Sequence, residues 1–329
     1  MKRIRSEGDL DELLASARLA AVVNAWADRG LFDELADGEP RTTAELSGDD
    51  RALRVTARML VHTGLLVRRG DTWALSPEGA QLREDGVLSS LRDFQRFQNL
   101  GQLDQILERG GPIVDEDGES ASTKIGAEPD DPQRTRHFQE MLYRRSARSA
   151  RATARWIDRC VDGEARVLDL GGGHGRYGIE LAERGHQTTL FDLPVAVDIA
   201  REMHGDDIDY IDGDFFEDDL GGLYDVVLAS NIIHGLSADQ NRRLFTRVAD
   251  VLAPGGIFVI KDMFLDEFDA WPPSAVYFGL TMLMYTDGGD SYSFNEASQW
   301  FEEAGLEVEE PVIFERYSLA IGRRADQGS

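Results

Sequence analysis

The sequence predicts an α/β protein in which a mostly α-helical domain precedes a parallel, doubly wound sheet. From Ala165 onward, short apolar runs alternate with helical segments, which is the pattern of consecutive strand–helix–strand units. Before residue 160 the apolar residues recur mainly at helical spacing. The length of 329 residues indicates two domains, or one domain with a substantial extension.

The first 95 residues follow the order helix, short helix, helix and β-hairpin. Thr42 or Thr43 can cap the short helix, which carries Glu45 in its first turn. The third helix ends at Gly64, and two short strands follow around a turn at residues 69–71. This order is typical of a winged helix-turn-helix, so we expect residues 1–95 to form a winged-helix domain.

Residues 96–160 are expected to form a helical connector. Helical stretches at 88–109 and 132–160 flank a loop at 110–131 that is rich in Gly, Asp and Pro. A loop of this length is more often functional or mobile than a simple connection. The predicted third segment, residues 161–329, contains the sheet.

The sheet segment reads as a regular alternation of elements. We predict strands at 166–172, 187–193, 208–216, 224–234 and 257–264, with helices at 175–185, 194–204 and 239–252. The sequence Ala-Pro-Gly-Gly at 253–256 predicts a turn. The tail from Ser293 adds a helix and a closing hairpin.

Composition excludes several classes of function. The formal net charge is −26, with 61 acidic and 35 basic side chains, and an acidic surface repels nucleic acid. Cys160 is the single cysteine, so no intramolecular disulfide or cysteine zinc site is expected, which fits a reducing cytosol. No window has transmembrane length and no His, Asp and Glu residues show metal-ligand spacing, so we expect a cytoplasmic protein without membrane or metal partners.

A glycine-rich turn follows the first sheet strand in the sequence "VLDLGGGHGRYG". A strand, the acidic Asp169 and a turn that opens a helix allow the backbone to approach a ligand at the helix N-terminus. The dinucleotide fingerprint fits only when it is counted from Gly173, although Gly171 already occupies the tight turn after the strand. A P-loop is excluded because no Lys-Ser/Thr pair follows.

Acidic residues follow the next two strands. Asp192, about 20 positions beyond the glycine turn, can accept hydrogen bonds from a ribose diol, or it can cap the following helix. Asp214 and Phe215, at the end of the third strand, can frame an adenine base, or they can belong to a surface acidic loop.

The motif order "VLDLGGGHG…FDLP…GDFF…SNIIH…LAPGG…IKD" resembles class I S-adenosylmethionine-dependent methyltransferases with a Rossmann-like sheet. It is most similar to the O-methyltransferases that act on caffeate, acetylserotonin and hydroxyneurosporene, and the similarity extends over essentially the whole chain. The resemblance implies an N-terminal winged-helix dimerisation domain, a homodimer, S-adenosylmethionine as cofactor, and a small, aromatic or apolar acceptor. The cofactor-binding residues that it implies are Asp169, Gly171, Gly173, Asp192, Leu193, Asp214 and Phe215.

The resemblance also implies catalytic and substrate-binding residues. His234 occupies the position of the family's general base, and Asp262 that of a carboxylate that orients the base. The ordinary imidazole pKa of about 6.5 suits proton removal from a hydroxyl. The segment departs from the family pattern because Gly235 and Leu236 replace Asp-Trp, and Ser291 replaces a glutamate. His234 is therefore either the base or a pocket residue. Expected substrate contacts are Phe138, Met141 and Met284.

Three functions compete. The first is methyl transfer from S-adenosylmethionine to a hydroxyl, with His234 as base. The second is carbon or nitrogen methylation on the same fold, which works by proximity. The third is a winged-helix DNA-binding regulator, suggested by arginines at 51, 54 and 58 on one helix face, and opposed by the acidic charge and the complete cofactor motif.

Overall fold

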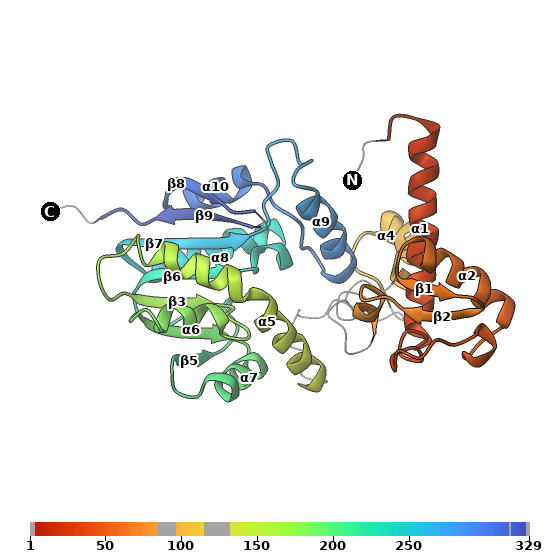
Figure 1. Ribbon diagram of the computed structural model, residues 1–329. Coiled ribbons are helices and arrows are strands. Elements are labelled where there is room, and N and C mark those ends of the chain that lie inside the picture. Colours follow the sequence, from red (N-terminus) through yellow and green to blue (C-terminus); the bar gives the residue numbers. More distant parts are fainter. Residues whose placement is uncertain (1–3, 84–96, 115–131, 316, 327–329) are drawn as a thin grey trace. The chain divides into compact units, whose positions relative to one another are not determined.

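In the computed structural model, residues 4–83, 97–114, 132–315 and 317–326 are described (Figure 1). The chain divides into two compact units, Met1–Gln105 and Ile106–Ser329. The predicted helix at 88–109 and loop at 110–131 lie partly outside the described residues. No described helix combines the length and apolar character needed to cross a membrane.

The first unit combines helices with one hairpin. Its elements are α1 (Glu7–Asp28), η1 (Thr43–Glu45), α2 (Asp50–His62), β1 (Leu66–Arg69), β2 (Thr72–Leu75), η2 (Gly79–Leu82) and η3 (Phe97–Gln102), and α4 (Leu103–Arg109) begins in it. Thr42 is the N-cap of η1, and its amide donates to Glu45 at 2.7 Å. β1 and β2 pair antiparallel. The element order agrees with the prediction, whereas a winged-helix dimerisation role stays a prediction.

The core of the first unit leaves half of α1 uncovered. Trp26 at its C-terminal end is buried and packs with Phe32, Leu60 and Trp73. The N-terminal half projects apolar side chains into solvent, including Leu10. A helix normally buries its apolar stripe, so this half lacks a partner within the described part of its own unit.

The second unit contains a seven-stranded, mostly parallel sheet with the strand order β5-β4-β3-β6-β7-β9-β8. Its strands are β3 (Arg166–Leu170), β4 (Gln187–Asp192), β5 (Asp209–Asp212), β6 (Tyr224–Ser230), β7 (Leu252–Asp262), β8 (Glu307–Ile313) and β9 (Ser318–Arg323). β9 runs antiparallel to β7 and β8, which confirms the predicted closing hairpin. The predicted α/β class with a doubly wound sheet is confirmed.

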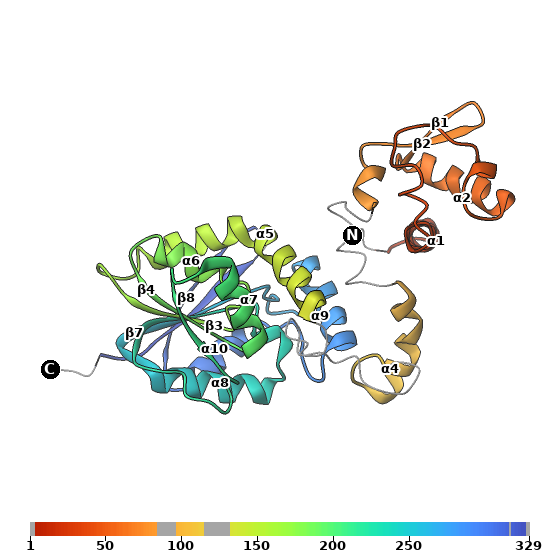
Figure 2. The ribbon, with the colours of Figure 1, turned by 90° about the horizontal axis from the view of Figure 1, so that it is seen from below.

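Helices cover both faces of this sheet (Figure 2). One face carries α5 (Pro132–Ile157), α6 (Arg176–Ala182) and α7 (Pro194–His204). The other carries α8 (Ala238–Val251) and α10 (Phe294–Glu303). The short η4 (Ile233–Gly235) follows β6, and α9 (Pro273–Tyr285) follows β7. Because β3 to β7 are parallel, their carboxyl ends lie at one edge of the sheet, where ligands bind in folds of this type.

Three local predictions were wrong. The strand predicted at 224–234 ends at Ser230, and residues 233–235 form the short helix η4. The turn predicted at 253–256 belongs to β7, because Gly255 and Gly256 exchange backbone hydrogen bonds with Arg324. β5 ends at Asp212, and the strand predicted at 208–216 is correspondingly shorter. Asp214 therefore lies in the following turn, where the amides of Glu217 and Asp218 donate to its carbonyl.

The domain boundaries predicted at residues 95 and 160 stay predictions. The two compact units meet at residue 105, inside the predicted connector. Helix α5, which makes up most of the rest of that connector, packs through Ala150, Ala154 and Ile157 into the same core as the sheet strands.

Candidate active site

The glycine turn joins β3 to α6 with a backbone conformation that favours glycine. Gly171 and Gly173 have φ values of 64° and 50°, in the left-handed region. A Cβ on Gly171 would lie 2.3 Å from Ile232 Cδ1, and one on Gly173 would lie 2.9 Å from Gln139 Oε1. The turn is therefore in contact with both α5 and the segment that precedes His234.

Asp192 binds the turn directly. Its Oδ2 accepts from the Gly173 amide at 2.7 Å, and its Oδ1 accepts from the Leu193 amide at 2.7 Å. Burial raises the pKa of Asp192 to about 6, although these two amides oppose the shift. Asp192 therefore lies beside the glycine turn, as its predicted role requires, and Leu193 is the N-cap of α7.

Asp169 supports the turn from the interior of the sheet. It is fully buried, and its Oδ2 accepts from the Gly178 amide of α6 at 2.8 Å. Its Oδ1 is buried and has no hydrogen-bond partner among the described residues. Burial raises the pKa of Asp169 to about 7, with a further contribution from the charge of Asp192.

Asp214 and Phe215 lie in the turn after β5. Asp214 Oδ1 accepts from the Phe216 amide at 2.9 Å, and the Asp214 amide donates to Asp218 Oδ2 at 2.8 Å. Phe215 packs against the sheet core and contacts the ring of Phe216 edge to face. Contact of this pair with a base stays a prediction.

His234 and Asp262, 28 residues apart in the chain, meet at the carboxyl ends of β6 and β7. His234 Nδ1 lies 2.8 Å from Asp262 Oδ1 and 3.0 Å from Oδ2. Asp262 is 2 % exposed, and its Oδ1 also accepts from the Met263 amide at 2.8 Å. A carboxylate at Nδ1 favours the tautomer that carries its proton there, which leaves Nε2 free to accept a proton.

Three side chains that the sequence did not predict support the segment that carries this imidazole. Asn241 of α8, fully buried, donates through Nδ2 to the carbonyl of Ile233 at 3.0 Å. Tyr292 donates its hydroxyl to the carbonyl of Leu236 at 2.6 Å. The ring of Phe278 on α9 contacts the imidazole edge to face, with centroids 4.8 Å apart. The one sign of this support in the sequence is Asn241, a polar residue on the apolar face of α8.

The predicted substrate residues lie on two helices. Phe138 and Met141 are half-buried on α5, next to the buried Gln139 that contacts Gly173. Met284 is 4 % exposed on α9, and its carbonyl accepts from the Ile113 amide at 2.9 Å. Contact of these three side chains with an acceptor stays a prediction.

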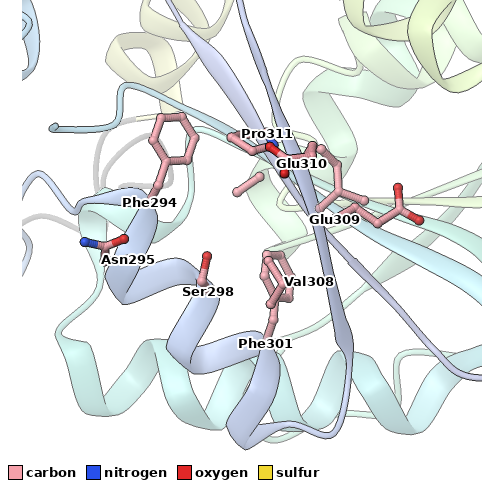
Figure 3. Close-up of a pocket in the computed structure, with 10 residues that line it drawn as sticks. Phe294, Asn295, Ser298, Phe301, Val308, Glu309, Glu310 and Pro311 are labelled. Atoms are coloured by element: carbon pink, nitrogen blue, oxygen red, sulfur yellow. The ribbon is translucent and has the colours of Figure 1, made fainter. Parts of the chain in front are cut away.

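A groove of about 330 Å³ lies elsewhere, between α10 and the edge strand β8 (Figure 3). Its lining includes Phe294, Ser298, Val308 and Glu310, and none of the predicted site residues. Among the described residues no group of three His, Cys, Asp or Glu side chains could hold a metal ion. The polar groups that converge are those around the glycine turn and His234.

Comparison with known proteins identifies the family of this chain. The model of the O-methyltransferase domain matches residues 118–307. The 3-hydroxy-5-methyl-1-naphthoate 3-O-methyltransferase of Streptomyces sahachiroi is 29% identical over 325 residues, which cover 93% of this chain and 91% of that protein. An N,N-dimethyltransferase of Streptomyces rimosus is 26% identical over 321 residues, which cover 90% of each of the two chains.

The fold also matches solved structures over nearly its full length. Human N-acetylserotonin methyltransferase, solved in complex with SAM (S-adenosylmethionine), superposes with a TM-score of 0.75 at 21% identity. The match covers 99% of this chain and 100% of the human one. At this identity the likeness is evidence for a common fold.

Proposed function

Because this chain belongs to the O-methyltransferase family, we propose that it transfers a methyl group from S-adenosylmethionine to a hydroxyl of a small aromatic acceptor. The chain is an S-adenosylmethionine-dependent methyltransferase by its family. The aromatic acceptor and the role of His234 are the proposed parts. The observation that carries the role of His234 is its pairing with Asp262 beside the glycine turn. The aromatic acceptor is proposed from the naphthoate-methylating relative.

The residues of the glycine turn fit the cofactor. Gly171 and Gly173 leave no side chain between the backbone and a ligand, and the buried Oδ1 of Asp169 is without a described partner. Asp192 presents a carboxylate at the end of β4, where a ribose diol can donate to it. Asp214 and Phe215 would hold the adenine end, one strand further along the sheet.

The catalytic step requires one proton acceptor. The bound cofactor supplies an electrophilic methyl group on a sulfonium. His234 Nε2 takes the proton of the acceptor hydroxyl while the oxygen–methyl bond forms and the sulfur–methyl bond breaks. Asp262 stabilises the resulting imidazolium and fixes the ring plane together with Phe278. Positioning the two reactants supplies most of the remaining rate enhancement.

Replacing Asp262 by Asn tests the orienting role. Asn can donate to Nδ1 and so favours the tautomer that carries its proton on Nε2, where it cannot act as a base. We expect kcat to fall on the order of 10²-fold to 10⁴-fold, with unchanged affinity for S-adenosylhomocysteine. Asp266→Asn, in the loop after β7, is the matched control. Equal kcat in Asp262→Asn and wild type would contradict the role.

Nitrogen methylation is the second candidate, because one relative is an N,N-dimethyltransferase. An amine acceptor is nucleophilic without a base, so its methylation would tolerate the loss of His234. The buried Asp262 beside the imidazole favours a hydroxyl as the acceptor. An amine acceptor attacks without first losing a proton, so the His234–Asp262 pair would have no proton to remove.

We also propose that the chain is a homodimer. Leu10, Leu13 and Leu14 on α1 are 46%, 38% and 46% exposed, and such an apolar stripe marks an interaction surface. α9 and the loop before it expose a second apolar set: Phe268, Trp271, Val276, Leu280 and Leu283.

Sedimentation equilibrium tests the dimer. We expect wild type to have twice the monomer mass and Leu10→Asp/Leu14→Asp to dissociate, because a buried unpaired carboxylate is costly. Leu223→Asp, at a position 47% exposed before β6, should leave the mass unchanged. A monomeric wild type would refute the proposal.

A further inference from the structure

A buried cation lies at the carboxyl end of β7. Lys261, one of three lysines in the chain, is 7 % exposed. Its Nζ donates to Asn231 Oδ1 at 2.7 Å and lies 4.9 Å from the ring centroid of Tyr317. Across the described ranges, no carboxylate comes within ion-pair distance of it. A buried ion without a counterion is unfavourable, so the site is suited to an anion.

A hydroxyl without a partner lies on the neighbouring strand. Ser230 of β6 is paired in register with Lys261. Leu228 and Val259, two residues earlier on each strand, belong to the core beneath α5 and α6. Side chains alternate along a strand, so Ser230 and Lys261 both face α5. Ser230 Oγ is buried and has no hydrogen-bond partner among the residues that the structure describes.

The backbone between the two strands is arranged to hold this ammonium group. Asn231 has a φ of 60°, which is unusual for a residue other than glycine and concentrates at functional sites. Its amide donates to the Lys261 carbonyl at 2.8 Å, and its Oδ1 accepts from Nζ of the same residue. The two contacts draw Nζ from β7 toward the end of β6.

The ammonium lies on the far side of the glycine turn from Asp192. The strand order β4-β3-β6-β7 places Asp192 at one side of the turn and Asn231 at the other, two strand spacings apart, or about 10 Å. The field of Lys261 reaches the turn itself. Burial, His204 and Arg176 lower the pKa of His174 to about 4, and the charge of Lys261 contributes in the same direction.

We propose that Lys261 Nζ is the counterion of the cofactor's α-carboxylate, with Ser230 Oγ as an adjacent hydrogen-bond donor. The inference rests on the cofactor assignment above. If Asp192 holds the ribose, the amino-acid part extends past the turn toward β6 and β7. The carboxylate is the anionic group at that end of the cofactor, and a charge-assisted bond in a buried site is strong.

Calorimetric titration with two ligands tests the proposal. S-adenosylhomocysteine carries the carboxylate, whereas its decarboxylated analogue, S-adenosyl-3-thiopropylamine, keeps the adenosine, thioether and amine. We expect wild type to bind S-adenosylhomocysteine at least about 10-fold more tightly than the analogue. In Lys261→Met we expect this preference to vanish through loss of affinity for S-adenosylhomocysteine, while Lys261→Arg keeps a preference.

The outcomes separate this inference from the proposed function. A wild type that binds neither ligand refutes the cofactor site as a whole. Equal affinity of wild type for the two ligands, or an undiminished preference in Lys261→Met, overturns the role of Lys261 alone. Should Lys261→Met fail to fold, Asn231→Gly serves instead. It keeps the left-handed backbone and removes Oδ1, and an unchanged preference there would count against the proposal.

Discussion

Replacing His234 by Ala should reduce methyl transfer to a hydroxyl by about 10²-fold to 10⁴-fold, the usual contribution of a general base. The acceptor keeps its proton in the variant, so its oxygen is a poor nucleophile. The buried Asp262 also loses its imidazole partner. The measurement is single-turnover transfer of labelled methyl from pre-bound S-adenosylmethionine, so that product release does not mask the chemical step.

Two controls isolate the imidazole. S-adenosylhomocysteine should bind His234→Ala as tightly as wild type, because Ile232, and not His234, contacts Gly171. His62→Ala, at an exposed position of α2 in the first unit, should transfer methyl at the wild-type rate. A His234→Ala rate within about threefold of wild type would instead support transfer by proximity alone.

Replacing Asp192 by Ala should weaken S-adenosylhomocysteine binding by about 100-fold or more. The carboxylate is buried, and two hydrogen bonds from a ribose to a charged group contribute about 1.5–3 kcal/mol each. Removing it also leaves the Gly173 amide without its acceptor. Calorimetric titration measures the loss. Asp198→Ala, on the exposed face of α7, is the matched control and should bind normally.

The same carboxylate predicts a pH dependence. The pKa of Asp192 is raised to about 6 by burial, so the group becomes protonated as the pH falls through that value. A protonated carboxyl loses acceptor capacity, and affinity should decrease below about pH 6. The decrease should be smaller in Asp192→Asn, which does not titrate. A wild-type affinity that is constant from pH 5 to pH 8 would argue against Asp192 as the ribose ligand.

The glycine turn and its position beside Asp192 could be predicted because their requirements are local. A left-handed turn in close contact with neighbouring side chains favours glycine, and the carboxylate that binds this turn lies at the end of the next strand. These constraints follow chain order, so the motif order also identified the family. The family model argues against the winged-helix regulator, because it is that of an O-methyltransferase domain.

The support of His234 depends on tertiary contacts that chain order does not encode. Asn241 comes from α8, Phe278 from α9 and Tyr292 from the segment between α9 and α10. The contact of Tyr292 joins residues 56 positions apart in the chain. The pairing of Gly255 and Gly256 with the C-terminal Arg324 is equally non-local, and it overrides the turn preference of Ala-Pro-Gly-Gly. In the sequence, Lys261 is an ordinary residue of a predicted strand, and only the structure shows the partners of its side chain.

The position of the transferred methyl group tests the proposed function most directly. Matched acceptors, such as 3-hydroxy-2-naphthoate and 3-amino-2-naphthoate, are incubated with wild type and His234→Ala, and the products are identified by mass spectrometry and NMR. We expect wild type to methylate the hydroxyl of the phenol, the amine to be a poor acceptor, and His234→Ala to lose the phenol reaction. Methylation of nitrogen or carbon that persists in His234→Ala would contradict base-assisted transfer to a hydroxyl.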